Sequence, residues 1–203
     1  GKILGNGGFG ITYKAWDTVL NRYVAIKEFY PSGIVNRVPG TNNVMLYAAK
    51  REKEYYAQKQ RFWDEAVNTK SFNHNIVDVL DYFEENDTAY FVMEFLDGVP
   101  LNKYLKEKGG KLSVQEAADI VLKIANALIT VHEEGFVHRD ISPDNIFMCK
   151  GGVVKLIDFG AARFAENEDA QLSIILKPGY APAEQYEKVN EQGPWTDIYA
   201  LGA

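Results

Sequence analysis

The sequence predicts an α+β fold made of two lobes. The first ninety-odd residues are mostly short runs of apolar, aromatic and β-branched residues separated by turn residues, which is typical of an antiparallel sheet. One segment inside this region, 48–70, is rich in Ala, Lys, Glu and Gln and predicts a single helix. After Asp97–Gly98 the apolar residues recur at helical spacing. We therefore expect a strand-rich first lobe with one main helix, followed by a mostly helical second lobe.

Five segments account for the predicted sheet. They are residues 3–4, 11–16, 22–28, 78–84 and 89–95. The last two are separated by Glu85–Asn86–Asp87, which is typical of a hairpin turn. Residues 44–46 predict a further brief strand. The function of residues 30–61 stays open between a cap on the first lobe and a docking surface.

Two helices and a hairpin are predicted in the second lobe. They are residues 101–108 and 113–134 for the helices, and 146–149 and 153–157 for the strands of the hairpin. Ser113 and Glu116 form a capping-box pattern at the start of the long helix, and Gly135 supplies its stop. We expect residues 1–95 to form the first lobe and residues 96–203 to form part of the second.

Composition and charge exclude several classes of protein. The chain has 203 residues and a net charge of −6, whereas a nucleic-acid-binding surface normally needs a basic excess. Its one cysteine, Cys149, cannot form a disulfide within the chain, which fits a reducing cytosol. No apolar stretch reaches the ~18 residues that a membrane-spanning helix needs. We expect no nucleic-acid partner.

Gly5–Asn6–Gly7–Gly8–Phe9–Gly10 fits the pattern G-x-G-x-x-G. A glycine-rich hairpin turn and a dinucleotide-binding turn fit it too. The dinucleotide version requires the glycines to lead into a helix, but a strand-like segment follows here. A flap of strand, glycine turn and strand lets backbone N–H groups approach phosphates without side chains in the way. The pattern therefore favours a phosphate-binding flap.

Lys27 ends the apolar strand that follows the glycines. A lysine in this place is often only an edge residue, but its spacing from the flap is typical of a lysine that contacts phosphates. A buried ammonium needs a carboxylate partner. Glu65 in the predicted helix is the best candidate, and Asp64 is a weaker one.

His138–Arg139–Asp140 with Asn145, and then Asp158–Phe159–Gly160, complete the pattern. In this order and spacing the whole set resembles the protein kinase superfamily, over essentially the entire chain. The segments EFYPSG, HRDISPDN and LKPGYAPAEQY resemble the bacterial eukaryotic-like Ser/Thr protein kinases. The resemblance implies a two-lobed protein-kinase-like fold. Both ends of the chain look cut, so we expect a truncated catalytic domain without the family's C-terminal helices.

The resemblance also implies ATP and Mg²⁺ as cofactors and a role for each matched residue. Asp140 would orient the substrate hydroxyl and accept its proton, and Asn145 and Asp158 would hold Mg²⁺. Lys27, paired with Glu65, would position the phosphates. The other nucleotide-binding positions would be Leu4, Gly5, Gly7, Gly8, Gly10, Ala25, Met93, Glu94 and Leu96.

Position 142 departs from the family. The residue two after the catalytic Asp is usually a Lys that steadies the γ-phosphate, and here it is Ser142. Counting back from Glu184 without gaps, Lys177 falls where the family usually has a Thr. We hypothesise that Lys177 supplies the missing ammonium beside Asp140. A surface lysine that lies there by coincidence is the alternative.

The same count places Ser173 at the family's usual phosphorylation site. Arg139 precedes the catalytic Asp, as in kinases whose activation loop is ordered by a phosphate–arginine pair. We expect phosphorylation of Ser173 to regulate the protein, unless the apolar residues of 171–176 order the segment instead. Asp197 matches a helical residue that supports the family's catalytic loop.

The leading interpretation is an ATP- and Mg²⁺-dependent protein Ser/Thr kinase of bacterial signalling, with Ser- or Thr-containing proteins as substrates. The alternative is a nucleotide-binding pseudokinase scaffold, which Ser142 supports. A small-molecule kinase of the aminoglycoside phosphotransferase type is disfavoured by the glycine flap and the peptide-docking segment 177–184. We expect a cytoplasmic catalytic domain, with any membrane attachment through regions outside this chain.

Overall fold

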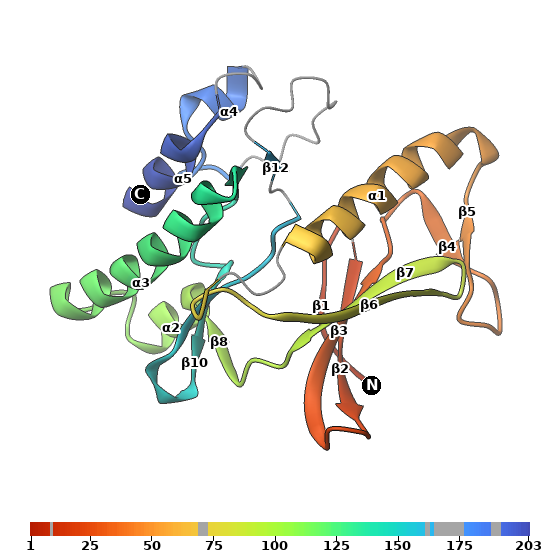
Figure 1. The fold of residues 1–203 in the computed structure, drawn as a ribbon, viewed down its shortest axis with the longest axis horizontal. Coiled ribbons are helices and arrows are strands. Elements are labelled where there is room, and N and C mark those ends of the chain that lie inside the picture. The colour runs from red at the N-terminus through yellow and green to blue at the C-terminus, as the bar shows by residue number, and fades with distance from the viewer. Residues whose placement is uncertain (9, 69–72, 161–162, 165–176, 188–191) are drawn as a thin grey trace. The chain divides into compact units, whose positions relative to one another are not determined.

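The short apolar runs of the first ninety residues form a five-stranded antiparallel sheet (Figure 1). This is seen in a computed structural model, which describes residues 1–8, 10–68, 73–160, 163–164, 177–187 and 192–203. The chain divides into two units, the first being Gly1–Lys70 with Asp78–Leu96, and the second Ser71–Val77 with Asp97–Ala203. The predicted α+β class is confirmed.

The sheet of the first unit has the strand order β1-β2-β3-β7-β6. Its strands are β1 (Lys2–Asn6), β2 (Gly10–Asp17), β3 (Arg22–Phe29), β6 (Val79–Glu85) and β7 (Thr88–Glu94). Asn86 and Asp87 form the predicted hairpin turn, and both have positive φ (52° and 60°), as the two-residue turns that match strand twist require. Each predicted strand of this sheet is therefore present, with its ends moved by at most two residues.

One long helix, α1 (Glu52–Asn68), covers the sheet, after a short 3-10 turn at Ala49–Arg51. The core between them contains Phe29 and Phe91 of the sheet and Tyr55 and Phe62 of the helix, all buried. The helix was predicted to begin at residue 48, and the α-helical part begins four residues later.

Residues 30–47 form an element that the sequence predicted only in part. The expected brief strand β5 (Val44–Leu46) is present, and it pairs with an unexpected strand, β4 (Val35–Arg37). Ile34, Val35 and Val44 belong to the core of the first unit. Residues 30–61 were expected to be either a cap on the first lobe or a docking surface. The burial of these side chains favours the cap.

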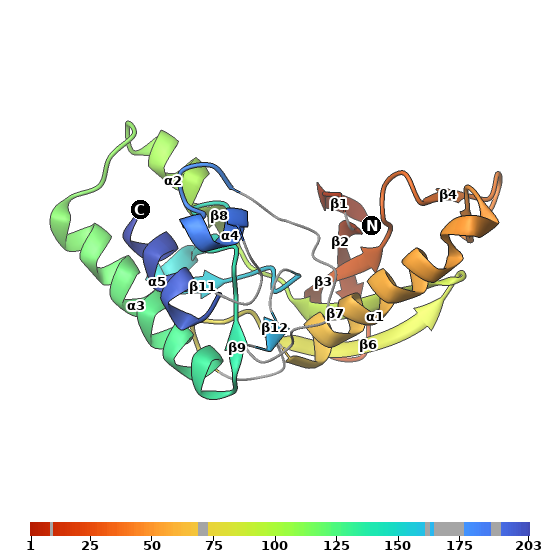
Figure 2. The same ribbon diagram turned by 90° about the horizontal axis from the view of Figure 1, so that it is seen from above.

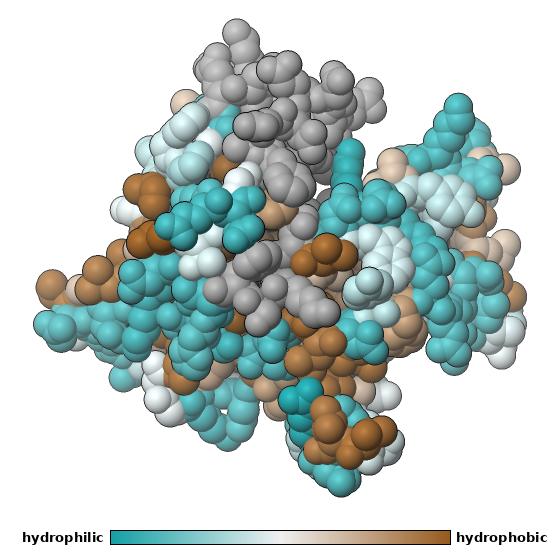
Figure 3. Space-filling view, viewed as in Figure 1, coloured by the Kyte–Doolittle hydropathy of each residue, from teal (hydrophilic) through white to brown (hydrophobic). Residues whose placement is uncertain are grey.

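The end of the β2–β3 hairpin is apolar, as the brown patch over it in Figure 3 shows. Val19 and Leu20 are 85% and 59% exposed, and their N–H groups both donate to Oδ1 of Asp17. A small patch of two apolar side chains at a turn is common on protein surfaces. They therefore indicate no site by themselves.

The second unit is mostly helical. Its helices are α2 (Leu101–Glu107), α3 (Val114–Glu133), α4 (Ala183–Glu187) and α5 (Pro194–Gly202). The predicted helical spacing in α3 is confirmed, because its five apolar positions Ile120, Ile124, Ala127, Leu128 and Val131 are all buried. Ser113 caps this helix by accepting a hydrogen bond from the N–H of Glu116, and Gly135 follows it with φ of 81°. In Figure 2, α3 is the long helix that packs on α5 and β11.

Short strands complete the second unit. A three-stranded sheet has the order β11-β10-β8, and a two-residue pair joins β9 to β12. Their bounds are β8 (Gly98–Pro100), β9 (Phe136–Val137), β10 (Ile146–Cys149), β11 (Val154–Leu156) and β12 (Arg163–Phe164), with a 3-10 turn at Lys150–Gly152 between β10 and β11. Strands of two or three residues carry no periodic pattern, which is why β8, β9 and β12 were not predicted.

The division between the units differs from the predicted boundary. Residues 73–77 belong to the second unit, although the sequence placed everything up to residue 95 in the first lobe. Val77 donates its N–H to the carbonyl of Leu156, and the Lys155 ammonium donates to the carbonyl of Ile76 at 3.0 Å. These bonds hold the segment beside β11.

Among the helices that the structure describes, none is both long enough and apolar enough to cross a membrane.

Candidate functional site

The predicted pair of Lys27 and Glu65 is present in the first unit. The Lys27 ammonium lies 2.7 Å from Oε1 of Glu65, and the two side chains are only 15% and 8% exposed. β3 carries the lysine and α1 carries the glutamate, so the packing of helix on sheet brings them together. Asp64, the weaker candidate, accepts a hydrogen bond from Gln60 on the exposed face of the helix.

The glycine segment joins two antiparallel strands. Gly5 pairs with Thr12 across β1 and β2, and Leu4 lies at the irregularity in their register. Because a strand and not a helix follows the glycines, the dinucleotide-binding alternative is wrong. A Cβ at Gly10 would lie 2.3 Å from the carbonyl oxygen of Glu28, so the close approach of β3 requires glycine there.

Gly5, Gly7 and Gly8 are in a different situation. A Cβ added at any of them would meet nothing within 4 Å. Packing within the described residues therefore does not require glycine at these positions. The open space beside the backbone suits a ligand that approaches closely, such as a phosphate.

The predicted nucleotide-binding positions outside the glycine segment lie on β3, on β7 and just after β7. Ala25 is opposite Met93 in the register of these strands, and Ala25 is buried. Glu94 at the end of β7 donates its N–H to the carbonyl of Asp78, while its side chain accepts the N–H of Asp78, both at 2.9 Å. Leu96 is the last residue of the first unit.

In the second unit, Asp197 of α5 supports the loop that contains Asp140. Its buried carboxylate accepts the N–H of His138 at 2.8 Å and that of Arg139 at 2.7 Å, and it lies 2.8 Å from Nε2 of His132. Arg139 has φ of 68°, a left-handed conformation that costs a residue other than glycine on the order of 1–3 kcal/mol. The hydrogen bonds from α5 stabilise this conformation.

Gln185 of α4 is a second support, and sequence reasoning missed it. Its Nε2 donates to the carbonyl of Arg139 at 2.9 Å, and the side chain is buried. Side chains of Gln185 and Asp197 thus bind both polar backbone atoms of Arg139. The burial of Gln185 cannot be read from the sequence, so no local signal could have identified it.

Asp140 and Asn145 are hydrogen-bonded to each other. The amide nitrogen of Asn145 donates to Oδ2 of Asp140 at 2.7 Å and to its carbonyl at 2.8 Å. Oδ1 of Asp140 is buried and has no hydrogen-bond partner among the described residues. Burial raises the pKa of Asp140, while the charge of Lys177 and the bond from Asn145 lower it. One carboxylate oxygen is therefore held and the other is left for a ligand.

The residues proposed to hold a metal fit Mg²⁺ by their donor atoms. Because the amide nitrogen of Asn145 is used by Asp140, the side-chain oxygen of Asn145 remains as an acceptor. Asp158 is exposed, has φ of 65°, and one of its oxygens accepts the N–H of Gly160 at 3.4 Å. The described residues contain no cluster of three or more His, Cys, Asp or Glu side chains suited to a metal. An amide and a carboxylate oxygen, completed by phosphates and water, are a typical Mg²⁺ set.

Lys177 contacts the loop of Asp140. This contact is required by the hypothesis that Lys177 replaces the family's usual Lys at position 142, which we call the exchange hypothesis. Its ammonium donates to Oγ of the buried Ser142 at 2.8 Å and forms an ion pair with Asp144 at 2.5 Å. Asp144 was not predicted, and it also accepts a hydrogen bond from Asn102 of α2. Since Ser142 holds the amine and Lys177 lowers the pKa of Asp140, the geometry favours the hypothesis over a coincidental surface lysine.

The surroundings of His138 indicate a structural role. It is fully buried, its ring lies edge-on to Phe159 with centroids 4.6 Å apart, and its Nε2 is 3.3 Å from the carbonyl of Ile157. Burial lowers the pKa of His138, which keeps the ring neutral at neutral pH.

Glu184 accepts a hydrogen bond from Thr196 at 3.1 Å. Ser173 lies outside the described residues.

Comparison with known proteins agrees with this geometry. Residues 1–203 match the family of the protein kinase domain. The chain is 33% identical to a probable serine/threonine-protein kinase of Clostridium perfringens, over 100% of this chain and 28% of that protein. It is 32% identical to serine/threonine-protein kinase PknA of Mycobacterium tuberculosis, over 99% of this chain and 44% of that protein.

Other matches extend the likeness. The chain is 30% identical to serine/threonine-protein kinase PrkC of Bacillus subtilis, over 99% of this chain and 28% of that protein. A solved structure described as PpkA-294 apo form superimposes with a TM-score of 0.86 and 39% identity, covering 100% of this chain and 71% of the other. The chain thus spans less than half the length of these three curated relatives. On the family match, the fold and these identities, the chain belongs to the protein kinase family and resembles its eukaryotic-like bacterial members.

Proposed function

We propose that this chain is the catalytic part of an ATP- and Mg²⁺-dependent protein Ser/Thr kinase. It would transfer the γ-phosphoryl group of ATP to a Ser or Thr hydroxyl of a protein substrate. The observation that carries the proposal is the carboxylate of Asp140, which has one oxygen bound by Asn145 and the other buried without a partner among the described residues. A general base for a substrate hydroxyl needs such an oriented carboxylate with one accepting oxygen.

In the transfer, a bond forms between the substrate oxygen and the γ-phosphorus while the bond from that phosphorus to the leaving oxygen of ADP breaks. Oδ1 of Asp140 accepts a hydrogen bond from the substrate hydroxyl, orients it and takes its proton. The carboxylate keeps its orientation because Asn145 binds its other oxygen and Asp197 holds the backbone before it. Positioning of this kind accounts for a large part of phosphoryl-transfer catalysis.

The cationic side chains would neutralise phosphate charge. Lys27, oriented by Glu65, would bind the α- and β-phosphates, and Lys177 would take the place of the usual Lys beside Asp140. Asn145 and Asp158 would hold Mg²⁺, which, when bound, neutralises charge that develops on the phosphates. Each group stabilises charge through an orientation that exists before the reaction, which is an efficient form of electrostatic catalysis.

Protein substrates are part of the proposal because the relatives are named Ser/Thr protein kinases. A pseudokinase scaffold has weaker support. The pseudokinase alternative was considered because position 142 lacks the usual cation. Lys177, whose ammonium donates to Ser142, supplies a cation at this place. Phosphorylation of Ser173 as a regulatory event stays a prediction.

Incubation with radiolabelled ATP, Mg²⁺ and a generic protein substrate tests the proposal. Asp140→Asn should lower the transfer rate by about a hundredfold to ten-thousandfold, because the base is lost. It should leave Mg–ATP binding, measured by calorimetry, nearly unchanged. Asp64→Asn on the exposed face of α1 is the matched control and should keep the wild-type rate. Transfer by Asp140→Asn at the wild-type rate, or a folded wild-type chain that binds no Mg–ATP, would contradict the proposal.

A further inference from the structure

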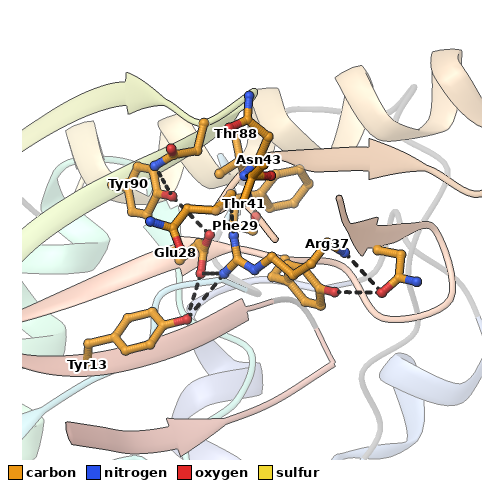
Figure 4. Close-up of polar contacts among 12 residues, drawn as sticks. Tyr13, Glu28, Phe29, Arg37, Thr41, Asn43, Thr88 and Tyr90 are labelled. Carbon is orange, nitrogen blue, oxygen red and sulfur yellow. Dashed lines mark hydrogen bonds and ion pairs between the residues drawn. The ribbon is translucent and has the colours of Figure 1, made fainter. Parts of the chain in front are cut away.

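Residues 31–47, called the strap below, follow directly after β3 and cover part of the first unit. The strap is anchored at Glu28, a residue of β3 that is only 1% exposed. Arg37 of the strap forms an ion pair with the Glu28 carboxylate, which also accepts hydrogen bonds from Tyr13 at 2.8 Å and Tyr90 at 3.0 Å. Figure 4 shows these three side chains converging on Glu28. A buried carboxylate with this many donors holds its partners firmly.

Two side chains of this anchor, Tyr13 and Arg37, bind their protons more tightly than usual. Burial and the hydrogen bond to Glu28 raise the pKa of Tyr13 to about 12. The hydrogen bond to Glu28 also raises the pKa of the Arg37 guanidinium. The Arg37 guanidinium and the Tyr13 phenol therefore keep their protons near neutral pH.

Further contacts fix the rest of the strap to the first unit. The N–H of Val44 donates to the carbonyl of Asn86, and the amide of Asn43 donates to Asp87 at 2.7 Å, so the strap is bound to the β6–β7 turn. Arg51, just before α1, donates to the carbonyl of Gly33. With three of its side chains in the core, the strap is packed as part of this unit.

One bond joins the strap to the glycine flap. The backbone N–H of Ser32 donates to the carbonyl oxygen of Gly8 at 2.9 Å. Ser32 lies in a turn closed by a bond from the N–H of Ile34 to the carbonyl of Pro31, and Gly33 has φ of 76°. These are the features of a type II turn with Ser32 at the position where proline is favoured.

We propose that the strap is a positioning element for the glycine flap. The Ser32 amide restrains Gly8, and the Arg37–Glu28 anchor holds Ser32 in place relative to β3. A flap that is restrained before the nucleotide arrives loses less conformational freedom on binding, so its affinity for phosphates rises. This inference rests on the proposed function, in which the flap binds the phosphates of ATP.

The turn itself accepts proline at position 32, so the bond can be removed there. Ser32→Pro deletes the N–H donor and puts its Cδ where the hydrogen pointed at the carbonyl of Gly8, so the flap must move away from the strap, whereas Ser32→Ala keeps the N–H and serves as the control. The probe is Mg²⁺ with a non-hydrolysable ATP analogue, measured by calorimetry. Because one hydrogen bond is lost, Ser32→Pro should weaken binding by about threefold to tenfold, with Ser32→Ala within about twofold of wild type.

Amide hydrogen exchange of the peptide that contains the flap, without nucleotide, is the second readout. Exchange should be faster in Ser32→Pro than in Ser32→Ala and the wild type, at equal thermal unfolding midpoints. Should Ser32→Pro fail to fold, Arg37→Lys tests the same element, because it keeps the charge but loses the planar donor fork of arginine. Arg37→Lys should also speed flap exchange and weaken binding of the analogue.

The outcomes separate this inference from the proposed function. Equal affinity and equal flap exchange in Ser32→Pro and the wild type would overturn the role of the strap and leave the kinase proposal intact. A wild-type chain that does not bind the analogue would overturn the kinase proposal, and flap exchange in the same variants would still decide whether the strap restrains Gly8.

Discussion

Lys27 in the first unit and Lys177 in the second carry the same ammonium group in different surroundings. Lys27 is paired with a carboxylate from a helix, and both side chains are mostly buried. Lys177 is bound by a buried hydroxyl and by Asp144, and in this ion pair the two side chains are 30% and 44% exposed. The first arrangement belongs to the packing of a helix on a sheet, whereas the second depends on how one loop lies on another.

This difference decides what each lysine contributes. Removing one partner of a mostly buried pair leaves a charge without its counter-ion, which in fully buried pairs costs about 3–5 kcal/mol. Exposed pairs typically contribute about 0.2–1 kcal/mol, because water and salt screen them. We therefore expect Lys27 to matter for stability and activity together, and Lys177 to matter mainly for activity.

The largest effect is expected from Lys27→Met. The change removes the ammonium that is proposed to bind the phosphates and that Glu65 orients, so kcat/KM should fall by about a hundredfold to a thousandfold. Steady-state kinetics with ATP as the varied substrate measures it, and thermal unfolding should show a lower midpoint. Lys59→Met, which removes the pair of Lys59 with the exposed Glu84, is the control and should keep kcat/KM within about twofold. Equal losses in the two variants would show that Lys27 has no special role.

The second effect tests the exchange at 142 and 177. Lys177→Met should lower kcat by roughly tenfold to a hundredfold, because an oriented cation beside Asp140 is lost. Ser142→Lys alone should also be impaired, since it places a second ammonium where Lys177 donates to Ser142. The double variant Ser142→Lys with Lys177→Thr restores the family's usual order and should recover most of the activity.

Kinetics of the single variants Ser142→Lys and Lys177→Thr and of the double variant form a cycle that measures this coupling. If the two substitutions acted independently, the fold-losses in kcat of the two single variants would multiply in the double variant. That result, or full activity of Lys177→Met, would refute the exchange.

The contrast between the two lysines also explains what the sequence could predict. The strands of the sheet and α1 follow from residue composition and turn residues, and α3 follows from helical spacing. The partner of Lys27 follows from motif order together with the face of one helix. Asp144 as the partner of Lys177 and Gln185 as the support of Arg139 are contacts across 33 and 46 positions of the chain. Nothing in a local pattern indicates which distant loop lies beside which, so these residues became evident only in the folded chain.

A smaller effect is expected from Asp144→Asn. The carboxylate orients the ammonium of Lys177, and Ser142 would still hold it, so kcat should fall by roughly twofold to fivefold. Stability should drop by less than about 1 kcal/mol, because the pair is partly exposed. Asp119→Asn, which breaks the exposed pair with Lys123 on α3, should cost similar stability and leave kcat unchanged. A loss of kcat in both variants would indicate a general effect of charge.

The smallest effect concerns the pH profile. Burial raises the pKa of Asp140 above the ordinary value of 3.8, and the charge of Lys177 lowers it again. A base must be ionised to act, so the acid limb of the profile of kcat/KM should lie above that of an ordinary aspartate. The folded chain holds this proton more tightly than the unfolded one, so ionisation of Asp140 weakens stability as the pH rises through the same range.

Lys177→Met removes the charge that opposes the upward shift, so the acid limb should move to higher pH. Ser142→Ala keeps the ammonium and should leave the limb in place, whatever it does to the rate. Profiles of kcat/KM for both variants, measured where each remains folded, make the comparison. A limb that moves to lower pH in Lys177→Met, or equally in both variants, would mean that the charge of Lys177 does not act on Asp140. The exchange hypothesis would then lose its electrostatic basis even if Lys177 were needed for the rate.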